Sequence, residues 1–149
     1  MHWMLLPLRR YADFSGRSRR MEFWMFSLFV SIIGLLLAMI GFAMSNISFT
    51  GDIVGDVSAS SAFAGFLPLI LFYIAIFVPS VAVQVRRFHD RDMSGWWVLG
   101  FSILSNIPVV GLFISVAWFV LLVLPGTYGD NRFGPDPKDP HLDIDQVFS

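Results

Sequence analysis

Three long stretches of this chain carry no acidic or basic side chain. They comprise residues 23–51, 57–85 and 93–129. The first two contain uncharged, largely apolar segments at 23–45 and 63–85, the second of which is interrupted by Pro68 and Pro79. About 20 apolar residues cross the hydrocarbon core of a bilayer. A mean hydropathy of +0.69, with 14% charged residues, is also unusual for a soluble domain. The sequence therefore predicts one all-α integral membrane domain over 1–149, with two full transmembrane helices.

The third stretch, residues 96–124, is too short for two complete crossings and longer than one helix needs. Its interior contains Ser105-Asn106-Ile107-Pro108 followed by Gly111, which is typical of a turn. We therefore expect a Pro-broken C-terminal helical hairpin with arms at Trp96–Ser105 and Val109–Leu124, the second beginning from Pro108. The alternative is one kinked helix, which would give three transmembrane helices. A polar tail, 125–149, follows.

Small residues form a regular stripe on the first span, and a comparable stripe of mostly small residues, with one Phe, lies on the second. Their spacing alternates between three and four residues, which places each stripe on one helical face. Such faces let helix backbones approach closely in a membrane, where no hydrophobic force drives helices together. We predict that the two stripes meet, although small residues are common enough to form one by chance. The stripes are Ser27, Ser31, Gly34, Ala38, Gly41 and Ser45, and Gly65, Pro68, Phe72, Ala75, Pro79 and Ala82.

Arginine placement predicts the orientation. The segments 1–22 and 86–95 carry five and three arginines, whereas the loop 46–62 between the first two spans carries none. Short loops rich in Lys and Arg stay in the cytoplasm. The N-terminus and the second loop are therefore expected to be cytoplasmic and the first loop external. A hairpin would return the tail to the cytoplasm, whereas a single third helix would place it outside. Aromatic residues among the arginines of 1–22 suggest a segment lying at the membrane interface.

Three polar segments flank the apolar stretches. They are FSGRSRRMEFW at 14–24, RRFHDRDMSGWW at 86–97 and PGTYGDNRFGPDP at 125–137. Taken together and in this order, they resemble the bacterial inner-membrane family called domain of unknown function 805, and the resemblance extends from about Phe14 to Pro137. It implies a multi-pass protein of the bacterial inner (plasma) membrane, with no established activity and no catalytic residues to transfer.

Seven arginines of these segments are the candidate binding residues. One interpretation is that they set the topology and contact lipid phosphate. The other is that they form one pocket for an anionic headgroup, a nucleotide or a carboxylate of a partner, using bidentate contacts that Lys does not make. Nine of the ten basic residues are Arg, which favours the pocket. The candidates are Arg17, Arg19, Arg20, Arg86, Arg87, Arg91 and Arg132.

We expect the other polar residues of the three segments to neutralise charge or to stabilise turns and helix ends. Asp90 and Asp92 neutralise nearby arginines, and Glu22 neutralises Arg19 or Arg20. Ser94 caps the helix that begins near Gly95, Asn131 favours a turn, and His89 supports the same motif. A metal or acid–base role for His89-Asp90-Arg91-Asp92 is not favoured, because adjacent residues project in different directions.

The sequence argues against ordinary enzyme chemistry. It has no cysteine, no Walker or dinucleotide-binding glycine pattern, and no H-E-x-x-H or G-x-S-x-G string. We predict no catalytic residues, no metal and no cofactor. Two classes remain: a binding or scaffolding module with an arginine-rich cytoplasmic face, or a small transporter or channel component. Membrane lipids and a protein partner or second copy are the expected partners, and nucleic acid is not. The interior of the spans lacks ionisable groups, which favours binding over transport.

Overall fold

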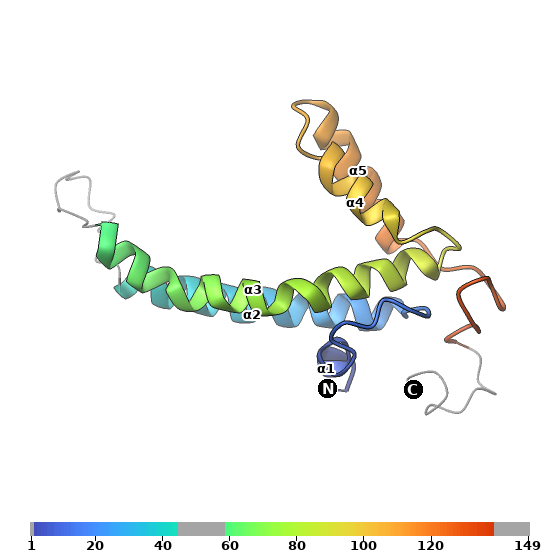
Figure 1. The fold of residues 1–149 in the computed structure, drawn as a ribbon, viewed down its shortest axis with the longest axis horizontal. Coiled ribbons are helices and arrows are strands. Elements are labelled where there is room, and N and C mark those ends of the chain that lie inside the picture. The colour runs from blue at the N-terminus through green and yellow to red at the C-terminus, as the bar shows by residue number, and fades with distance from the viewer. Residues whose placement is uncertain (1, 45–58, 139–149) are drawn as a thin grey trace. The chain divides into compact units, whose positions relative to one another are not determined.

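A computed structural model describes residues 2–44 and 59–138 of the chain. Within these residues the protein is helical and contains no strand, apart from one isolated bridge between Asn131 and Gly134. The all-α prediction is therefore confirmed. Most of the predicted external loop and the end of the tail lie outside the described residues. The five helices, coloured along the chain in Figure 1, are α1 His2–Arg9, α2 Arg20–Met44, α3 Ala59–His89, α4 Trp96–Leu104 and α5 Val110–Val123.

The helices α2 and α3 are long and apolar enough to cross a membrane. Large apolar side chains such as Leu35, Met39 and Ile74 are exposed along them. Surfaces of this kind suit lipid rather than water, because a soluble monomer rarely exposes extended apolar patches. The chain is thus a membrane protein with two long apolar helices and a shorter one.

The end of α3 differs from the prediction. We expected the second span to stop at Val85, yet the helix continues to His89 and includes Arg86 and Arg87. It ends in a Schellman-type turn, because Asp92 adopts a left-handed φ of 58° and its N–H donates to the His89 carbonyl oxygen at 2.9 Å. The N–H of Met93 completes the turn by donating to Phe88 at 3.0 Å. The two arginines therefore have fixed helical positions rather than belonging to a loop.

One compact unit, residues 27–78, consists of parts of α2 and α3. The two helices approach closely at Gly41, where a Cβ atom would lie 2.9 Å from the Gly65 carbonyl oxygen and 2.8 Å from the Phe66 ring. At Gly34 the neighbour is the Tyr73 hydroxyl, at 2.6 Å from such an atom. The predicted stripes thus meet at Gly41 and Gly65. Gly34 instead packs against Tyr73, which is not part of the predicted stripe.

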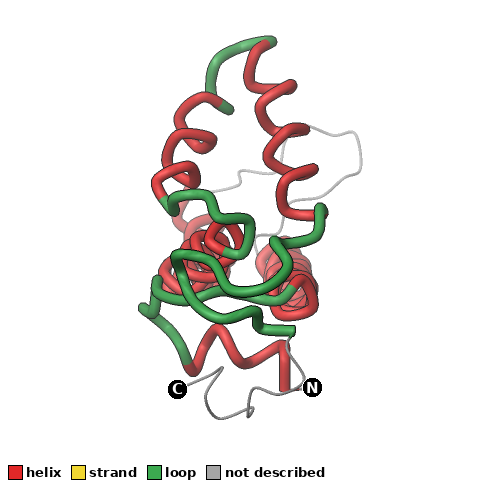
Figure 2. Tube along the Cα trace, turned by 90° about the vertical axis from the view of Figure 1, so that its right-hand side faces the viewer, coloured by secondary structure: helices red, strands yellow, loops and turns green. Residues whose placement is uncertain are grey.

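The second unit contains the N-terminal segment to residue 26 and the chain from residue 79. Here α4 and α5 form an antiparallel pair joined by a short turn, as Figure 2 shows. The predicted hairpin is confirmed, although its second arm begins at Val110 instead of Pro108. The turn requires Gly111, since a Cβ atom there would overlap the Ser105 carbonyl group. At 1.5 Å per residue the arms are about 14 and 21 Å long, so neither covers a full bilayer core.

Aromatic side chains connect the helices of this unit. Phe101 on α4 stacks on Phe88 of α3 with ring centroids 5.8 Å apart, and it also contacts Trp118 of α5 at 5.9 Å. Trp24 on α2 meets Phe119 on α5 edge-on at 5.8 Å. The hairpin is therefore packed against the charged ends of α2 and α3, which brings the three polar segments together.

Candidate functional site

The centre of the polar region is Asp90, the residue directly after α3. Its side chain is 1% exposed and lies between two arginines. Asp90 Oδ1 accepts hydrogen bonds from Arg17 Nε at 3.1 Å and Nη2 at 2.9 Å, while Oδ2 accepts one from Arg87 Nη1. We call Arg17, Arg87 and Asp90 the arginine–aspartate cluster. Because the carboxylate is shared between two guanidinium groups, each charge in this dry region has an opposite charge beside it.

Arg17 connects the N-terminal segment to the tail loop. Its Nη1 donates to the Gly129 carbonyl oxygen and its Nη2 to the Thr127 carbonyl oxygen, both at 2.6 Å. Its Nη2 also lies 4.0 Å from Asp136 Oδ1. The Asp90 backbone oxygen completes the link by accepting from Thr127 N at 2.8 Å. One buried guanidinium group thus joins all three polar segments.

Arg87 connects α3 to the end of α5. Its Nε donates to the Leu122 carbonyl oxygen at 3.1 Å, and its Nη2 donates to that of Leu124. The last carbonyl groups of a helix have no partner within the helix and carry partial negative charge. A cation that donates to them therefore stabilises the end of α5 and holds it against α3.

Gly126 is required where the tail loop passes the cluster. A Cβ atom at this position would overlap the Asp90 carboxylate and lie 2.7 Å from the Asp90 carbonyl oxygen. Any other residue would have to displace either the loop or the carboxylate. Glycine is common in turns and the contact with Asp90 depends on the tertiary structure, so the sequence alone does not reveal why this position requires glycine.

A second buried ion pair lies on the facing ends of α2 and α3. Arg86 Nη2 is 3.1 Å from Glu22 Oε1, and the side chains are 0% and 1% exposed. The prediction that Glu22 neutralises Arg19 or Arg20 is therefore wrong: its partner comes from the other helix. Nearby, Ser18 N donates to the Arg86 carbonyl oxygen at 3.3 Å, which fixes the N-terminal segment against α3.

His89 holds the N-terminal segment and the tail from its other side. Its Nδ1 lies 3.2 Å from the Gly16 carbonyl oxygen, and its ring stacks on Phe133 at a centroid distance of 3.9 Å. Asn131 Nδ2 donates to the His89 carbonyl oxygen at 2.9 Å. In the described part of the chain, no group of three or more His, Cys, Asp or Glu side chains is placed to bind a metal. His89 and Asn131 thus connect the N-terminal segment, the end of α3 and the tail loop.

The remaining candidate arginines lie nearer the surface. Arg132 pairs with Asp92 at 3.0 Å, with both side chains about half exposed. Arg19 donates to the Pro137 carbonyl oxygen and lies over the Trp3 ring. Arg20 is exposed and donates to the Val123 carbonyl oxygen at 3.3 Å. Arg91 is half-buried, and its Nε and Nη1 have no hydrogen-bond partner among the described residues.

Ser94 is a weaker helix cap than we predicted. The N-cap position of α4 is Gly95, and no side chain caps it. Ser94 Oγ lies 3.4 Å from Trp96 N, and the Ser94 carbonyl oxygen accepts from Trp97 N at 3.2 Å. At 3.4 Å the hydroxyl interaction is weak, so the Ser94 side chain remains available for another partner.

Two carboxyl groups near the surface are kept ionised. Partial burial raises the pKa of Asp13, but hydrogen bonds from Ser15 and Arg10 outweigh this and lower it to about 2. Burial likewise raises the pKa of Asp136, and the backbone N–H groups of Lys138 and Gly129, with the charge of Arg17, bring it below its ordinary value. Both groups therefore stay negative at neutral pH and balance neighbouring arginines.

The structure thus brings the three polar segments together and separates the predicted arginines by exposure. Arg17, Arg86 and Arg87 are buried, with relative exposures of 5%, 0% and 0%. Arg20 and Arg132 are exposed, and Arg19 and Arg91 are intermediate. Binding of an anion by these residues remains a prediction, and the buried members already have acidic neighbours.

Comparison with known proteins identifies relatives along nearly the whole chain. Residues 11–135 match the family described as a protein of unknown function (DUF805). The chain is 39% identical over 145 residues to the inner membrane protein YhaH of Escherichia coli (strain K12), an alignment that covers 93% of this chain and 98% of YhaH. It is 36% identical over 145 residues to the inner membrane protein YhaI of the same strain, covering 93% and 97%.

A more distant relative is the uncharacterized protein YiiR of Escherichia coli (strain K12). It is 27% identical over 155 residues, with 92% of this chain and 94% of YiiR covered. No solved structure matches the chain. The comparisons therefore agree with the apolar helices on a place in the inner membrane and assign no reaction.

Proposed function

The chain belongs to the DUF805 family of inner-membrane proteins of unknown function, and from that premise we propose that it is a non-catalytic module binding anionic lipid headgroups. The binding groups in this proposal are arginines outside the arginine–aspartate cluster. The observation that carries it is the difference in exposure: Arg17 and Arg87 have the shared Asp90 carboxylate, whereas Arg9 and Arg20 are exposed.

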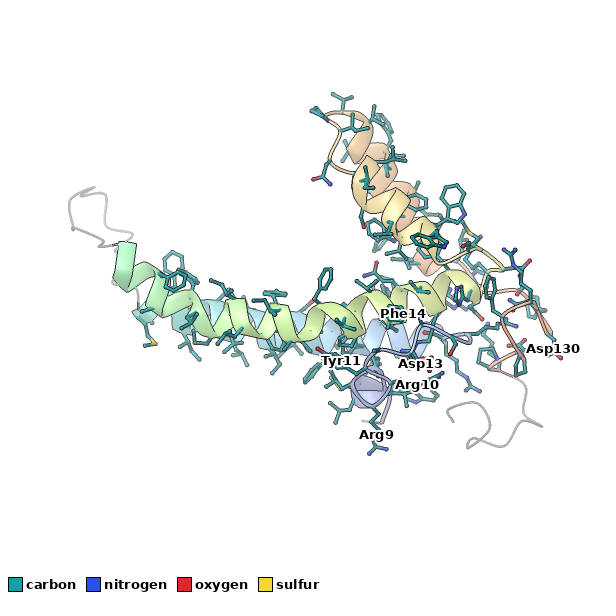
Figure 3. All side chains as sticks on the ribbon, in the orientation of Figure 1. Arg9, Arg10, Tyr11, Asp13, Phe14 and Asp130 are labelled. Atoms are coloured by element: carbon teal, nitrogen blue, oxygen red, sulfur yellow. The ribbon has the colours of Figure 1, made fainter. Side chains whose placement is uncertain are left out.

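The N-terminal segment has the composition of a surface that lies against headgroups. In α1, Leu6 is buried against the protein while Leu5 and Arg9 are exposed. Arg9 projects outward from this helix in Figure 3. At the start of α2, exposed Arg20 is followed by exposed Met21. Apolar groups beside arginines favour the membrane interface, where each cation contributes about 1 kcal/mol of attraction to anionic lipid.

We further propose that this surface faces the cytoplasm. Hydrogen bonds from Arg17 join the N-terminal segment to both Asp90 and Thr127, so the three polar segments lie on one side of any membrane that α2 and α3 cross. These segments contain most of the arginines, and the positive-inside rule then favours the cytoplasmic side.

The orientation is tested with a fluorescent protein that matures only in the cytoplasm. Fused after Ser149, it is expected to fluoresce. A dark fusion at normal protein levels, with an active periplasmic reporter at the same position, would contradict the orientation.

Lipid binding is tested on protein purified in a non-ionic detergent and freed of lipid. We expect phosphatidylglycerol to bind more tightly than phosphatidylcholine, as measured by native mass spectrometry over a lipid titration. The double variant Arg9→Gln, Arg20→Gln should lose at least about tenfold of this preference, since two cations near a surface contribute about 2 kcal/mol.

The matched control is Arg132→Gln, which removes an exposed arginine that already has Asp92 as its partner. This variant should retain most of the preference. If the double variant selected phosphatidylglycerol as strongly as the unmodified protein, the proposed role of the exposed arginines would be wrong. A thermal melt of each variant verifies that the fold is unchanged.

A further inference from the structure

A groove separate from the arginine–aspartate cluster lies where α3, α4 and the N-terminal segment meet. Its volume is about 480 Å³, and most of its wall is apolar. Val81 and Val85 contribute from α3, Leu99 from α4, and Phe14 from the N-terminal segment, where Figure 3 labels it. His89 and Ser94 provide polar groups on the same wall. The groove thus combines a long apolar surface with a small polar end.

The imidazole of His89 has one nitrogen free for a ligand. Its Nδ1 faces the Gly16 carbonyl oxygen, which only accepts hydrogen bonds, so we assign the proton to Nδ1. In the neutral ring Nε2 is then an acceptor. A Cβ atom at Gly95, which also lines the groove, would lie 3.2 Å from Nε2, so this nitrogen faces the groove. Among the described residues, no donor is hydrogen-bonded to it.

Ser94 supplies the opposite hydrogen-bonding property. Its hydroxyl oxygen makes only the weak 3.4 Å contact with Trp96 N, which leaves the O–H free to donate. The groove therefore presents an acceptor and a donor next to apolar walls. Trp96, on the same wall, is 77% exposed, as is usual for a tryptophan at the membrane interface.

We propose that this groove binds a phospholipid whose headgroup carries a hydrogen-bond donor, either an ammonium or a hydroxyl group. The headgroup donates to His89 Nε2, a phosphate oxygen accepts from Ser94 Oγ, and an acyl chain lies along Val81, Val85 and Leu99. A membrane protein meets such molecules at high local concentration. The site needs no arginine and no net lipid charge, so it is independent of the binding proposed above.

The test compares phosphatidylethanolamine with phosphatidylcholine, which have no net charge and differ in whether the headgroup nitrogen carries hydrogens. We expect the delipidated protein to bind phosphatidylethanolamine at least about tenfold more tightly in native mass spectrometry, because a hydrogen bond from a charged donor contributes about 1.5 kcal/mol or more. Phosphatidylglycerol serves as the hydroxyl donor. The Arg9→Gln, Arg20→Gln variant should weaken its binding while leaving the preference for ethanolamine over choline intact.

Three variants locate the site. His89→Asn retains an amide able to donate to Gly16 but removes Nε2, so it should abolish most of the ethanolamine preference. Ser94→Ala removes the donor to the phosphate, which both lipids carry, so it should weaken binding of both and leave the preference in place. Leu99→Trp fills the apolar wall and should weaken binding of both lipids. Ile103→Trp is the control, because it adds the same ring at an exposed position of α4 outside the groove. Equal binding of the two lipids by the unmodified protein would overturn the proposal. So would an unchanged preference in His89→Asn, or unchanged binding of both lipids in Leu99→Trp.

Discussion

The helices α2 and α3 take part in two regions that are held together in different ways. In residues 27–78 they contact through glycines and aromatic rings, as at Gly41 and Phe66. In the other unit buried charges join them: Arg86 on α3 pairs with Glu22 on α2, and just beyond the helix ends Arg17 pairs with Asp90. The first kind of contact depends on shape, whereas the second depends on having each charge beside its opposite.

This difference predicts different tolerance to substitution. A close contact between helices is lost more gradually, because a neighbouring ring can turn aside or the backbones can separate slightly when a side chain grows. A buried charge that loses its partner retains its full desolvation cost, since no water is near to replace the partner. The charged region should therefore show the larger single-residue effects, even though it is polar.

The largest effect is expected for Asp90→Asn. The neutral amide leaves Arg17 and Arg87 without their shared counter-charge, and breaking a buried pair typically costs about 3–5 kcal/mol. We expect a loss of this size in the free energy of unfolding, measured by denaturant titration in detergent micelles and followed by tryptophan fluorescence.

The control for this prediction is Asp92→Asn, two residues away. Its partner Arg132 is 59% exposed, and an exposed ion pair contributes about 1 kcal/mol or less. Equal losses for Asp90→Asn and Asp92→Asn would show that burial does not set the strength of these pairs, and the comparison between the two regions would then fail.

The fold was largely predictable because its strongest signals are local. Long stretches without charge identify α2 and α3, and Ser105-Asn106-Ile107-Pro108 with Gly111 identifies the turn of the hairpin. The predicted end of the second span was too early, because we treated Arg86 as a loop residue. No Pro or Gly lies between Arg86 and Asp92, and the spacing of Arg87 and Asp90 suits one helical face, so both signals were present in the sequence.

The partners within the site were not predictable from local patterns. Arg17, Arg19 and Arg20 have the same chemistry and lie within four positions, yet only Arg17 reaches Asp90. The choice depends on where the tail loop passes, which in turn requires Gly126 to fit against Asp90. These contacts join residues more than 70 positions apart, as the bonds from Arg17 to Asp90 and Thr127 illustrate.

A smaller effect is expected for Gly41→Leu in the other region. A side chain at Gly41 meets the Gly65 carbonyl oxygen, so relief requires the backbones of α2 and α3 to separate. We expect a loss of about 1–3 kcal/mol in the free energy of unfolding, measured by the same titration, as is usual for overpacked sites.

Gly34→Leu should cost less, because the atom it meets is the hydroxyl at the far end of Tyr73, which is able to turn away. If Gly34→Leu proved as damaging as Gly41→Leu, the contact at Tyr73 would be as rigid as backbone. A loss for either variant as large as that of Asp90→Asn would mean that small-residue packing, rather than charge pairing, is the stronger constraint on this helix pair.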